Sequence, residues 1–313
     1  MSDLTSRVAG RDEQAVAGLL ATLPAEEVVD LLTATSDDDV RRLTEDPAVR
    51  RGAVTALLGR LHEFADPVRL AEIEGVVDFD LRLRGGSECY RLRFTDGAIE
   101  PAVGTSHDGS ADVVVRLSAL RFLRLVTGQA NAGLLLLGGR LSVEGDAMLA
   151  LAVGGVFRVP GTDAPAVDPA ALDPVDVARA IAKVRTEHLR DVMAGGFRPV
   201  VLGEIFRRMP EYVDPAKAAD LRCTVAFRVG GRPDGEHDRY LVQVADGACQ
   251  VVEDTGEGTP RDVTLSLSGV DFLRLATGHL NPVLGVLKGS LKVKGDRAKA
   301  LAFSSSLDLP VMS

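Results

Sequence analysis

The chain has 313 residues, 46% of them hydrophobic, and its 36 basic and 45 acidic residues give a formal net charge of −9 at pH 7. This acidic balance excludes duplex nucleic acid as an expected partner and argues against simple adsorption to anionic lipid. The length predicts about two domains. The polar first residues predict no secretory signal, and since no apolar run approaches about 18 residues we expect no stable membrane insertion and a cytoplasmic location.

Helical sequence opens the chain. A proline and two acids in the run Pro24-Ala25-Glu26-Glu27 stand where a helix N-terminus favours them. A longer amphipathic stripe follows, with apolar residues about one helical turn apart at Val49, Ala53, Leu57, Leu61 and Phe64. The stripe ends at Asp66-Pro67, which is a turn signal. We therefore expect an N-terminal helical arm ahead of the first strand.

An alternation of apolar and polar residues then predicts strands. Its apolar positions are Val77, Phe79, Leu81 and Leu83, then Tyr90, Leu92 and Phe94, then Ile99, then Val113, Val115 and Leu117, and after a helical interval Leu141 and Val143. Asp96-Gly97 predicts a tight hairpin between the second and third strands. Because each strand carries one apolar face, we expect a five-stranded, largely antiparallel sheet with one face covered.

Short helices are expected around the fifth strand. The first of them ends at Thr127-Gly128, where glycine suits a position that needs a positive φ. Asn131 is placed to cap the next helix, and Asp146 is placed to cap the last one. These caps explain the polar residues without assigning them any chemistry.

The second half of the chain repeats this order. Asp112–Val153 and Asp262–Phe303 align without gaps and are identical at 21 of 42 positions, whereas chance would give about a tenth. We therefore predict an α+β protein with two tandem copies of one domain, each a five-stranded, largely antiparallel sheet covered by helices and preceded by a helical arm. The first copy spans residues 1–160 and the second 174–313, and the Pro-, Ala- and Asp-rich residues 161–173 form the linker.

Three segments of the second copy carry a resemblance to a known family. They are DFLRLATGHLNP (271–282), LKGSLKVKGD (287–296) and the apolar end ALAF (300–303). Together they resemble the sterol carrier protein-2 type lipid-binding domain, over roughly residues 45–160 and 195–310. The resemblance implies a hydrophobic tunnel between sheet and helices that binds fatty acids, acyl-CoA esters, sterols or isoprenoid-like lipids, with no chemistry and no cofactor.

The apolar residues of the helices are the candidates for lining that tunnel. In the first copy they are Phe122, Leu125, Val126, Leu134, Leu137, Met148 and Leu151, and in the second Phe272, Leu275, Leu284, Leu287, Leu301 and Phe303. Arg297 and Lys299 replace apolar positions in the last helix, so they are candidates for contacting a charged head group. They belong to a basic stretch from Lys288 to Lys299, for which a solvated face is the structural alternative.

Motifs for catalysis are missing from the sequence. The five histidines make no metal spacing, the glycines match neither phosphate nor dinucleotide fingerprints, and the three cysteines form no CxxC pair. We therefore expect no catalytic residue, metal or cofactor, and a hydrophobic small molecule as the partner. Two alternatives stay open, an enzyme on this fold that tailors a hydrophobic metabolite and a protein-interaction module. The oligomeric state is open, an internal pseudo-dimer of the copies is one arrangement, and the composition hints at a bacterial source.

Overall fold

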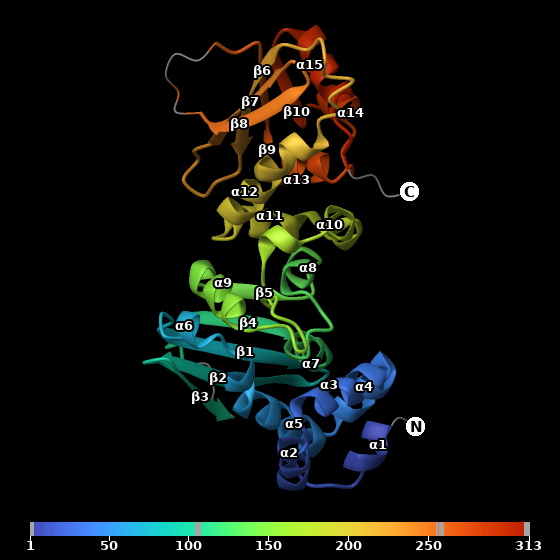
Figure 1. Ribbon diagram of the computed structural model, residues 1–313, viewed down its shortest axis with the longest axis vertical. Coiled ribbons are helices and arrows are strands. Elements are labelled where there is room, and N and C mark those ends of the chain that lie inside the picture. The colour runs from blue at the N-terminus through green and yellow to red at the C-terminus, as the bar shows by residue number, and fades with distance from the viewer. Residues whose placement is uncertain (1–2, 104–107, 255, 257–259, 310–313) are drawn as a thin grey trace. The chain divides into compact units, whose positions relative to one another are not determined.

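The computed structural model describes residues 3–103, 108–254, 256 and 260–309 (Figure 1). The chain divides into two compact units, unit 1 (Met1–Asp168) and unit 2 (Pro169–Ser313). The division falls within the predicted linker 161–173. Each unit holds one of the two predicted copies and has its own sheet and helices.

Unit 1 begins with a helical arm. The arm consists of α1 (Asp3–Val8), α2 (Glu13–Thr22), α3 (Ala25–Ala34), α4 (Asp37–Glu45) and α5 (Pro47–Gly59). The other helices of unit 1 are α6 (Pro67–Leu70), α7 (Ala119–Val126), α8 (Ala132–Leu137) and α9 (Ala147–Val156). Its strands are β1 (Gly75–Leu83), β2 (Gly86–Thr95), β3 (Ala98–Val103), β4 (Val113–Ser118) and β5 (Ser142–Gly145). A short 3-10 helix, Leu61–Phe64, connects α5 to α6.

Unit 2 repeats this order from the counterpart of α3 onward, except that turns at residues 215–220 take the place of α6. Its helices are α10 (Pro174–Ile181), α11 (Thr186–Ala194), α12 (Arg198–Arg208), α13 (Gly269–Ala276), α14 (Pro282–Lys288) and α15 (Arg297–Ser305). Its strands are β6 (Cys223–Gly230), β7 (Asp238–Ala245), β8 (Ala248–Glu253), β9 (Val263–Ser268) and β10 (Leu291–Gly295). Short 3-10 helices lie at Pro169–Ala171 and Met209–Tyr212. The helical arm predicted for each copy is therefore confirmed.

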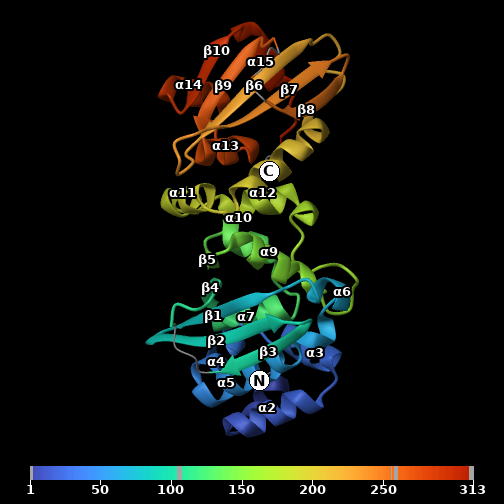
Figure 2. The same ribbon diagram turned by 90° about the vertical axis from the view of Figure 1, so that its left-hand side faces the viewer.

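The two sheets have the same topology. Their strand orders are β3-β2-β1-β4-β5 and β8-β7-β6-β9-β10, and Figure 2 shows the strands of unit 2 side by side in this order. In each sheet the first strand of the unit is central and pairs antiparallel with the second and parallel with the fourth. The other pairs are antiparallel. The prediction of five-stranded, largely antiparallel sheets is confirmed, with one parallel pair in each.

Local signals in the sequence mark the turns and caps correctly. Asp96 and Gly97 have φ angles of 50° and 72°, the left-handed values that a two-residue hairpin with the normal strand twist requires. Asn131 and Asn281 accept hydrogen bonds from the backbone N–H groups three residues on, both at 3.1 Å. The predicted N-cap of α8 is thus confirmed, and its repeat caps α14.

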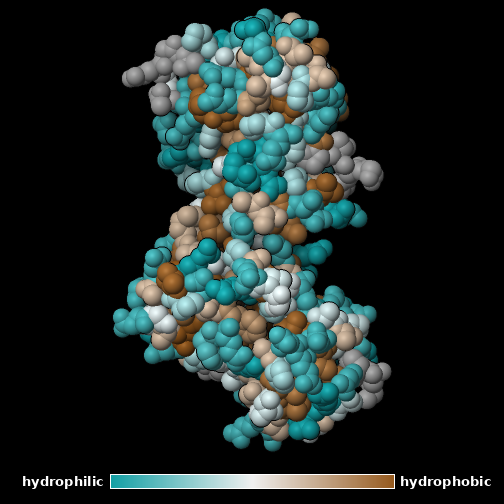
Figure 3. Space-filling view, viewed as in Figure 1, coloured by the Kyte–Doolittle hydropathy of each residue, from teal (hydrophilic) through white to brown (hydrophobic). Residues whose placement is uncertain are grey.

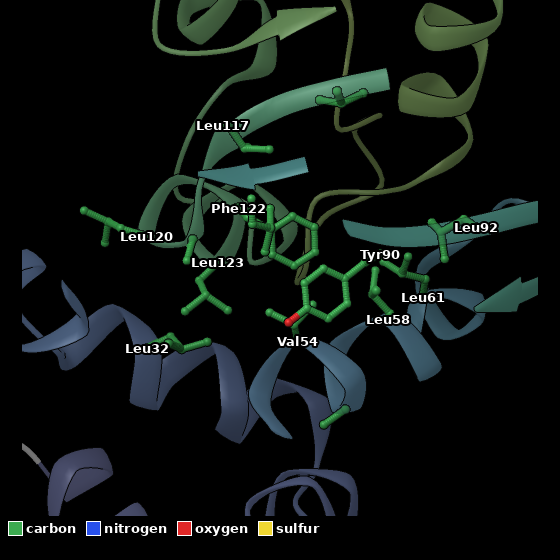
Figure 4. Packing of buried hydrophobic residues seen from close by; sticks show 14 of the residues in the cluster. Leu32, Val54, Leu58, Leu61, Tyr90, Leu92, Leu117, Leu120, Phe122 and Leu123 are labelled. Carbon is green, nitrogen blue, oxygen red and sulfur yellow. The ribbon is translucent and has the colours of Figure 1, made fainter. Parts of the chain in front are cut away.

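The core of unit 1 lies between the sheet and the helices of the arm and α7. Figure 4 shows Tyr90 of β2 and Phe122 of α7 between the strands and the helix that carries Val54 and Leu58. Both rings are closed to solvent. The extra helix α2 packs on α5 at Gly52, where a Cβ atom would lie only 2.6 Å from the carbonyl oxygen of Glu13. Unit 1 therefore has a double layer of helices over one region of its core.

Candidate functional site

The segment FLRLxTG builds the same short helix in both units. Phe122 of α7 packs edge-on against Phe79 of β1 with ring centroids 5.4 Å apart, and the equivalent rings of Phe272 and Phe227 are 5.7 Å apart. The hydroxyl of Thr127 then donates to the carbonyl of Leu123 at 2.6 Å, and the backbone N–H of Thr127 donates to the same carbonyl at 3.2 Å. The motif therefore anchors this helix on the sheet through its aromatic ring and ends it through its threonine.

The arginine of the same motif holds the helical arm. Arg124 donates to the carbonyls of Leu32 at 2.6 Å and Thr35 at 2.7 Å, and it pairs with the Asp37 carboxylate at 2.8 Å. In unit 2 the equivalent Arg274 donates to the hydroxyl of Thr186 at 2.8 Å. Asp37 and Thr186 are the first residues of α4 and α11. The contact between this helix and the arm is therefore duplicated with the rest of the domain.

A buried arginine in the last helix of the arm forms a second connection, to the sheet. Arg50 of α5 binds the carboxylate of Glu88 on β2 through Nε at 2.9 Å and Nη2 at 2.7 Å, and it also donates to the carbonyl of Thr44. The Tyr90 hydroxyl donates to the same carboxylate at 3.0 Å. The hydrogen bonds from Arg50 lower the pKa of Glu88 to about 2, and burial raises the pKa of Tyr90 above its ordinary value.

Sequence reasoning missed this pair, although the duplication contains a signal for it. Arg50 and Arg198 both interrupt an apolar stripe and lie 148 residues apart, the same offset that relates the two arms. Arg198 Nε lies 2.6 Å from Asp238 Oδ2, and Asp238 lies 150 residues after Glu88. Both guanidinium groups are almost fully buried. An arginine that is retained at matching core positions in both copies would have identified the two ion pairs from the sequence.

Two small apolar cavities lie under the helical arm of unit 1. One, of about 30 Å³, is lined by side chains of α1 to α5 and by Leu123 of α7. The other, of about 20 Å³, lies between α2, α3, α5 and the end of α7. Its lining includes Leu20, Val28, Leu61 and Val126. Both cavities are much smaller than the roughly 300–1,000 Å³ that small-molecule sites usually occupy.

Aromatic rings pack against one another in the interior of unit 2. Phe206 of α12 stacks on Tyr240 at a centroid distance of 3.8 Å and on Phe272 at 4.9 Å. Phe227 packs edge-on against this stack and against Phe303 of α15. In unit 1 the positions of Phe206 and Phe303 are taken by Leu58 and Val153. The two units therefore differ in how the space between sheet and helices is filled.

The residues predicted to line a tunnel occupy three kinds of environment. Phe122, Phe272 and Phe303 are closed core residues, and Leu137 is also buried. The half-buried set is Leu125, Val126, Leu134, Leu151 and Leu275. The exposed set is Met148, Leu284, Leu287 and Leu301. The structure brings Phe272 and Phe303 together around Phe227 and places Val126 at a cavity, but it turns the exposed set toward solvent.

The two head-group candidates also differ from each other. Lys299 Nζ lies 2.6 Å from Asp262 Oδ1, and this hydrogen bond raises the pKa of the lysine and lowers the pKa of the aspartate. Arg297, the first residue of α15, is exposed. Lys299 is therefore engaged within unit 2, whereas Arg297 faces solvent.

Within the described parts of the chain, no group of three or more His, Cys, Asp or Glu side chains is arranged to hold a metal ion. In the same residues, no helix is long and apolar enough to cross a membrane.

Comparison with known proteins gives one family for both units. A family model described as the SCP-2 sterol transfer family matches residues 55–158 and 202–308, which is more than half of the chain. Rat "Sterol carrier protein 2" is 31% identical over 80 residues, and this match covers 26% of the chain but only 14% of the rat protein. The "Fatty acid-binding protein" of Yarrowia lipolytica is 30% identical over 90 residues, which cover 28% of the chain and 70% of that protein.

A similar solved structure is the apo form of sterol carrier protein 2 from Yarrowia lipolytica. It is 28% identical to this chain with a TM-score of 0.23, and the match covers 37% of the chain and 88% of that protein.

Proposed function

Because this chain belongs to the SCP-2 sterol transfer family, we propose that it binds and carries a hydrophobic ligand between the sheet and the helices without transforming it. Support comes from the lining of the interior of unit 1. Leucine, valine and alanine side chains make up most of the lining of both cavities, which lie on the helical side of this interior, and such a space favours an apolar guest over water. Each methylene of the guest that leaves water contributes about 0.8 kcal/mol to binding.

The ligand class that we propose is a lipid with a long apolar part, that is, a fatty acid, an acyl-CoA ester, a sterol or an isoprenoid-like molecule. A fatty acid is the first candidate because one relative is named as a fatty acid-binding protein. Cys223 and Cys249 are free thiols, which is typical of proteins from a reducing compartment. We therefore place this carrier in the cytoplasm.

Unit 1 is the binding lobe in this proposal. Its interior combines apolar cavities with the smaller side chains Leu58 and Val153, where unit 2 has the rings of Phe206 and Phe303. Since the cavities are far smaller than a lipid, binding requires the arm of α1–α5 to move away from α7. Residues Phe122, Leu125 and Val126 of α7 would then contact the ligand.

A fluorescence titration with a fatty acid that carries an environment-sensitive label tests this function. The purified chain should bind the probe with a saturable signal, and unlabelled fatty acid should displace it. Ala53→Leu fills space at the larger cavity and should weaken binding at least tenfold, whereas Phe206→Leu changes only the interior of unit 2 and should leave the affinity unchanged. Thermal unfolding of both variants checks that each is folded.

Two results would count against the proposal. If the chain binds neither the labelled fatty acid nor a labelled sterol, it is not a lipid carrier of this kind. If Phe206→Leu changes the affinity and Ala53→Leu does not, the binding lobe is unit 2 instead. Native mass spectrometry of the chain with bound fatty acid gives the stoichiometry independently.

A further inference from the structure

Exposed apolar side chains of unit 2 cluster in its last two helices. Over the face shown in Figure 3, hydrophobic residues are scattered among hydrophilic ones. Among the described residues of unit 2, however, five of the seven exposed large hydrophobic residues belong to α14 or α15. These five are Val283, Leu284, Val286, Leu287 and Leu301. Leu287 is 77% exposed and Leu301 is 61% exposed.

The sequence of α14 explains why its apolar residues face outward. The helix packs against the edge strand β10 through Gly285, where a Cβ atom would lie 3.3 Å from Cβ of Leu291 and 3.6 Å from Leu280. Gly285 is the buried residue of this helix. A helix that buries a glycine and exposes two valines and two leucines gains little from its own domain. An exposed apolar surface of this kind indicates a contact with something else.

Basic side chains lie on the same two helices and on β10, the strand that packs against both of them. Lys288 ends α14, Lys292 and Lys294 lie on β10, and Arg297 begins α15, and all four are exposed. Asp296 is the only acidic residue between Pro282 and Ser305, and its carboxylate caps α15 by accepting from the backbone of Ala298 and Lys299. The local charge is therefore strongly positive although the whole chain carries −9.

The equivalent surface of unit 1 lacks the basic residues and exposes one large apolar side chain, Met148 of α9, instead of five. Lys288, Lys292, Lys294 and Arg297 are replaced there by Gly138, Ser142, Glu144 and Ala147. Leu137, which corresponds to Leu287, is 6% exposed. The combination of exposed apolar helix and basic border is thus a feature that unit 2 has and unit 1 lacks.

We propose that unit 2 docks on the surface of an anionic lipid bilayer through this basic–apolar surface, defined by Val283, Leu284, Val286, Leu287, Leu301, Lys288, Lys292, Lys294 and Arg297. The leucines and valines enter the boundary between head groups and acyl chains, and the basic residues contact lipid phosphates. Attraction to an anionic leaflet strengthens binding about fivefold for each basic residue near the surface. This docking goes beyond the carrier function, since it requires no ligand in unit 1.

Co-sedimentation of the full chain with vesicles tests the docking. Vesicles of phosphatidylcholine alone are compared with vesicles that contain one part phosphatidylglycerol to three parts phosphatidylcholine. The chain should bind the anionic vesicles at least tenfold more tightly, and added salt should weaken the binding. Lys292→Gln/Lys294→Gln should lose about tenfold or more, and Leu284→Ser/Leu287→Ser should lose a similar factor. Lys183→Gln/Arg190→Gln removes the same charge from exposed positions elsewhere in unit 2 and should bind as the unchanged chain does.

Three results would overturn the proposal. The chain could fail to bind anionic vesicles, or the lysine and leucine variants could bind as tightly as the control variant. Size-exclusion chromatography could also show a dimer that the leucine variant dissociates, in which case the surface is occupied by a second copy. Fatty acid titration without vesicles separates this inference from the carrier function, because Lys292→Gln/Lys294→Gln should bind the labelled fatty acid normally.

Discussion

Arg50 and Glu88 join the helical arm of unit 1 to its sheet through two hydrogen bonds of 2.9 Å and 2.7 Å. Their side chains are 5% and 16% exposed, so the ion pair is nearly withdrawn from water. Arg198 and Asp238 form the same connection at 2.6 Å in unit 2. The duplication has therefore kept a buried ion pair, which hydrophobic residues of similar volume could replace without loss of stability. Its retention is consistent with a role in fixing how the arm lies on the sheet.

Removing the arginine should destabilise unit 1 strongly. Arg50→Met leaves the Glu88 carboxylate with Arg51 and Tyr90 as its remaining partners, and we expect this loss to cost about 1–3 kcal/mol. Hydrogen exchange measured by mass spectrometry on peptides of α5 and β2 reports the free energy of unfolding of unit 1 separately from that of unit 2. Arg41→Ala is the matched control because it removes an exposed ion pair with Asp38, and it should cost less than about 1 kcal/mol. Equal losses in the two variants would contradict this prediction.

The same carboxylate should make unit 1 sensitive to acid. The pKa of Glu88 is lowered from 4.5 to about 2 in the folded chain, so its ionised form contributes stability above pH 4.5. That contribution, about 3 kcal/mol at most, is lost as the pH falls from 4.5 toward 2. Unfolding measured over this range should show a steeper loss for the unchanged chain than for Glu88→Gln. Parallel curves for the two proteins would show that Glu88 does not carry the effect.

The glycine that ends the fifth strand should not tolerate a side chain in either unit. Gly145 and Gly295 have φ angles of 91° and 104°, and a Cβ atom would lie 2.0 Å and 2.2 Å from the carbonyl oxygens of Asp112 and Asp262. Alanine at either position therefore combines backbone strain with a clash against the backbone, and we expect a loss of more than about 2 kcal/mol. Gly18→Ala, at an exposed helical position with open space, should instead stabilise by up to about 1 kcal/mol. Urea unfolding of the three variants compares them, and a neutral Gly295→Ala would refute the expected clash.

Loosening the arm should alter access to the interior of unit 1. Arg124→Ala removes hydrogen bonds to Leu32, Thr35 and Asp37, so α3 and α4 lose a connection to α7. We expect hydrogen exchange in α3 and α4 to rise about tenfold, and stopped-flow mixing should show faster association of labelled fatty acid. Arg274→Ala is the equivalent change in unit 2, where it should raise exchange in α11 without altering the association rate. An unchanged rate in Arg124→Ala would argue against opening at this arm.

The sequence alone predicted the elements and their duplication because these depend on neighbouring residues. Alternation predicted the strands, Asp96-Gly97 predicted a hairpin and Asn131 predicted a cap, and each of these signals acts within a few residues. Because equivalent residues of the two copies lie 150 positions apart over the aligned ranges, each element predicted in one copy is also predicted in the other. The family resemblance rested on the same short segments, and the family model matches both units.

Tertiary structure alone decided which side chains meet and which face solvent. Nothing near Phe206 in the sequence indicates that it stacks between Tyr240 and Phe272, and nothing near Leu287 indicates that it is exposed while Leu137 is buried. Arg50 reaches Glu88 across 38 residues, and Arg124 reaches Asp37 across 87. Local patterns determine which face of an element is apolar, but burial depends on the partner that the fold brings to that face. The sequence therefore determined two copies of one domain, and only packing distinguished a unit with apolar cavities from a unit with a cluster of aromatic rings and an exposed basic–apolar surface.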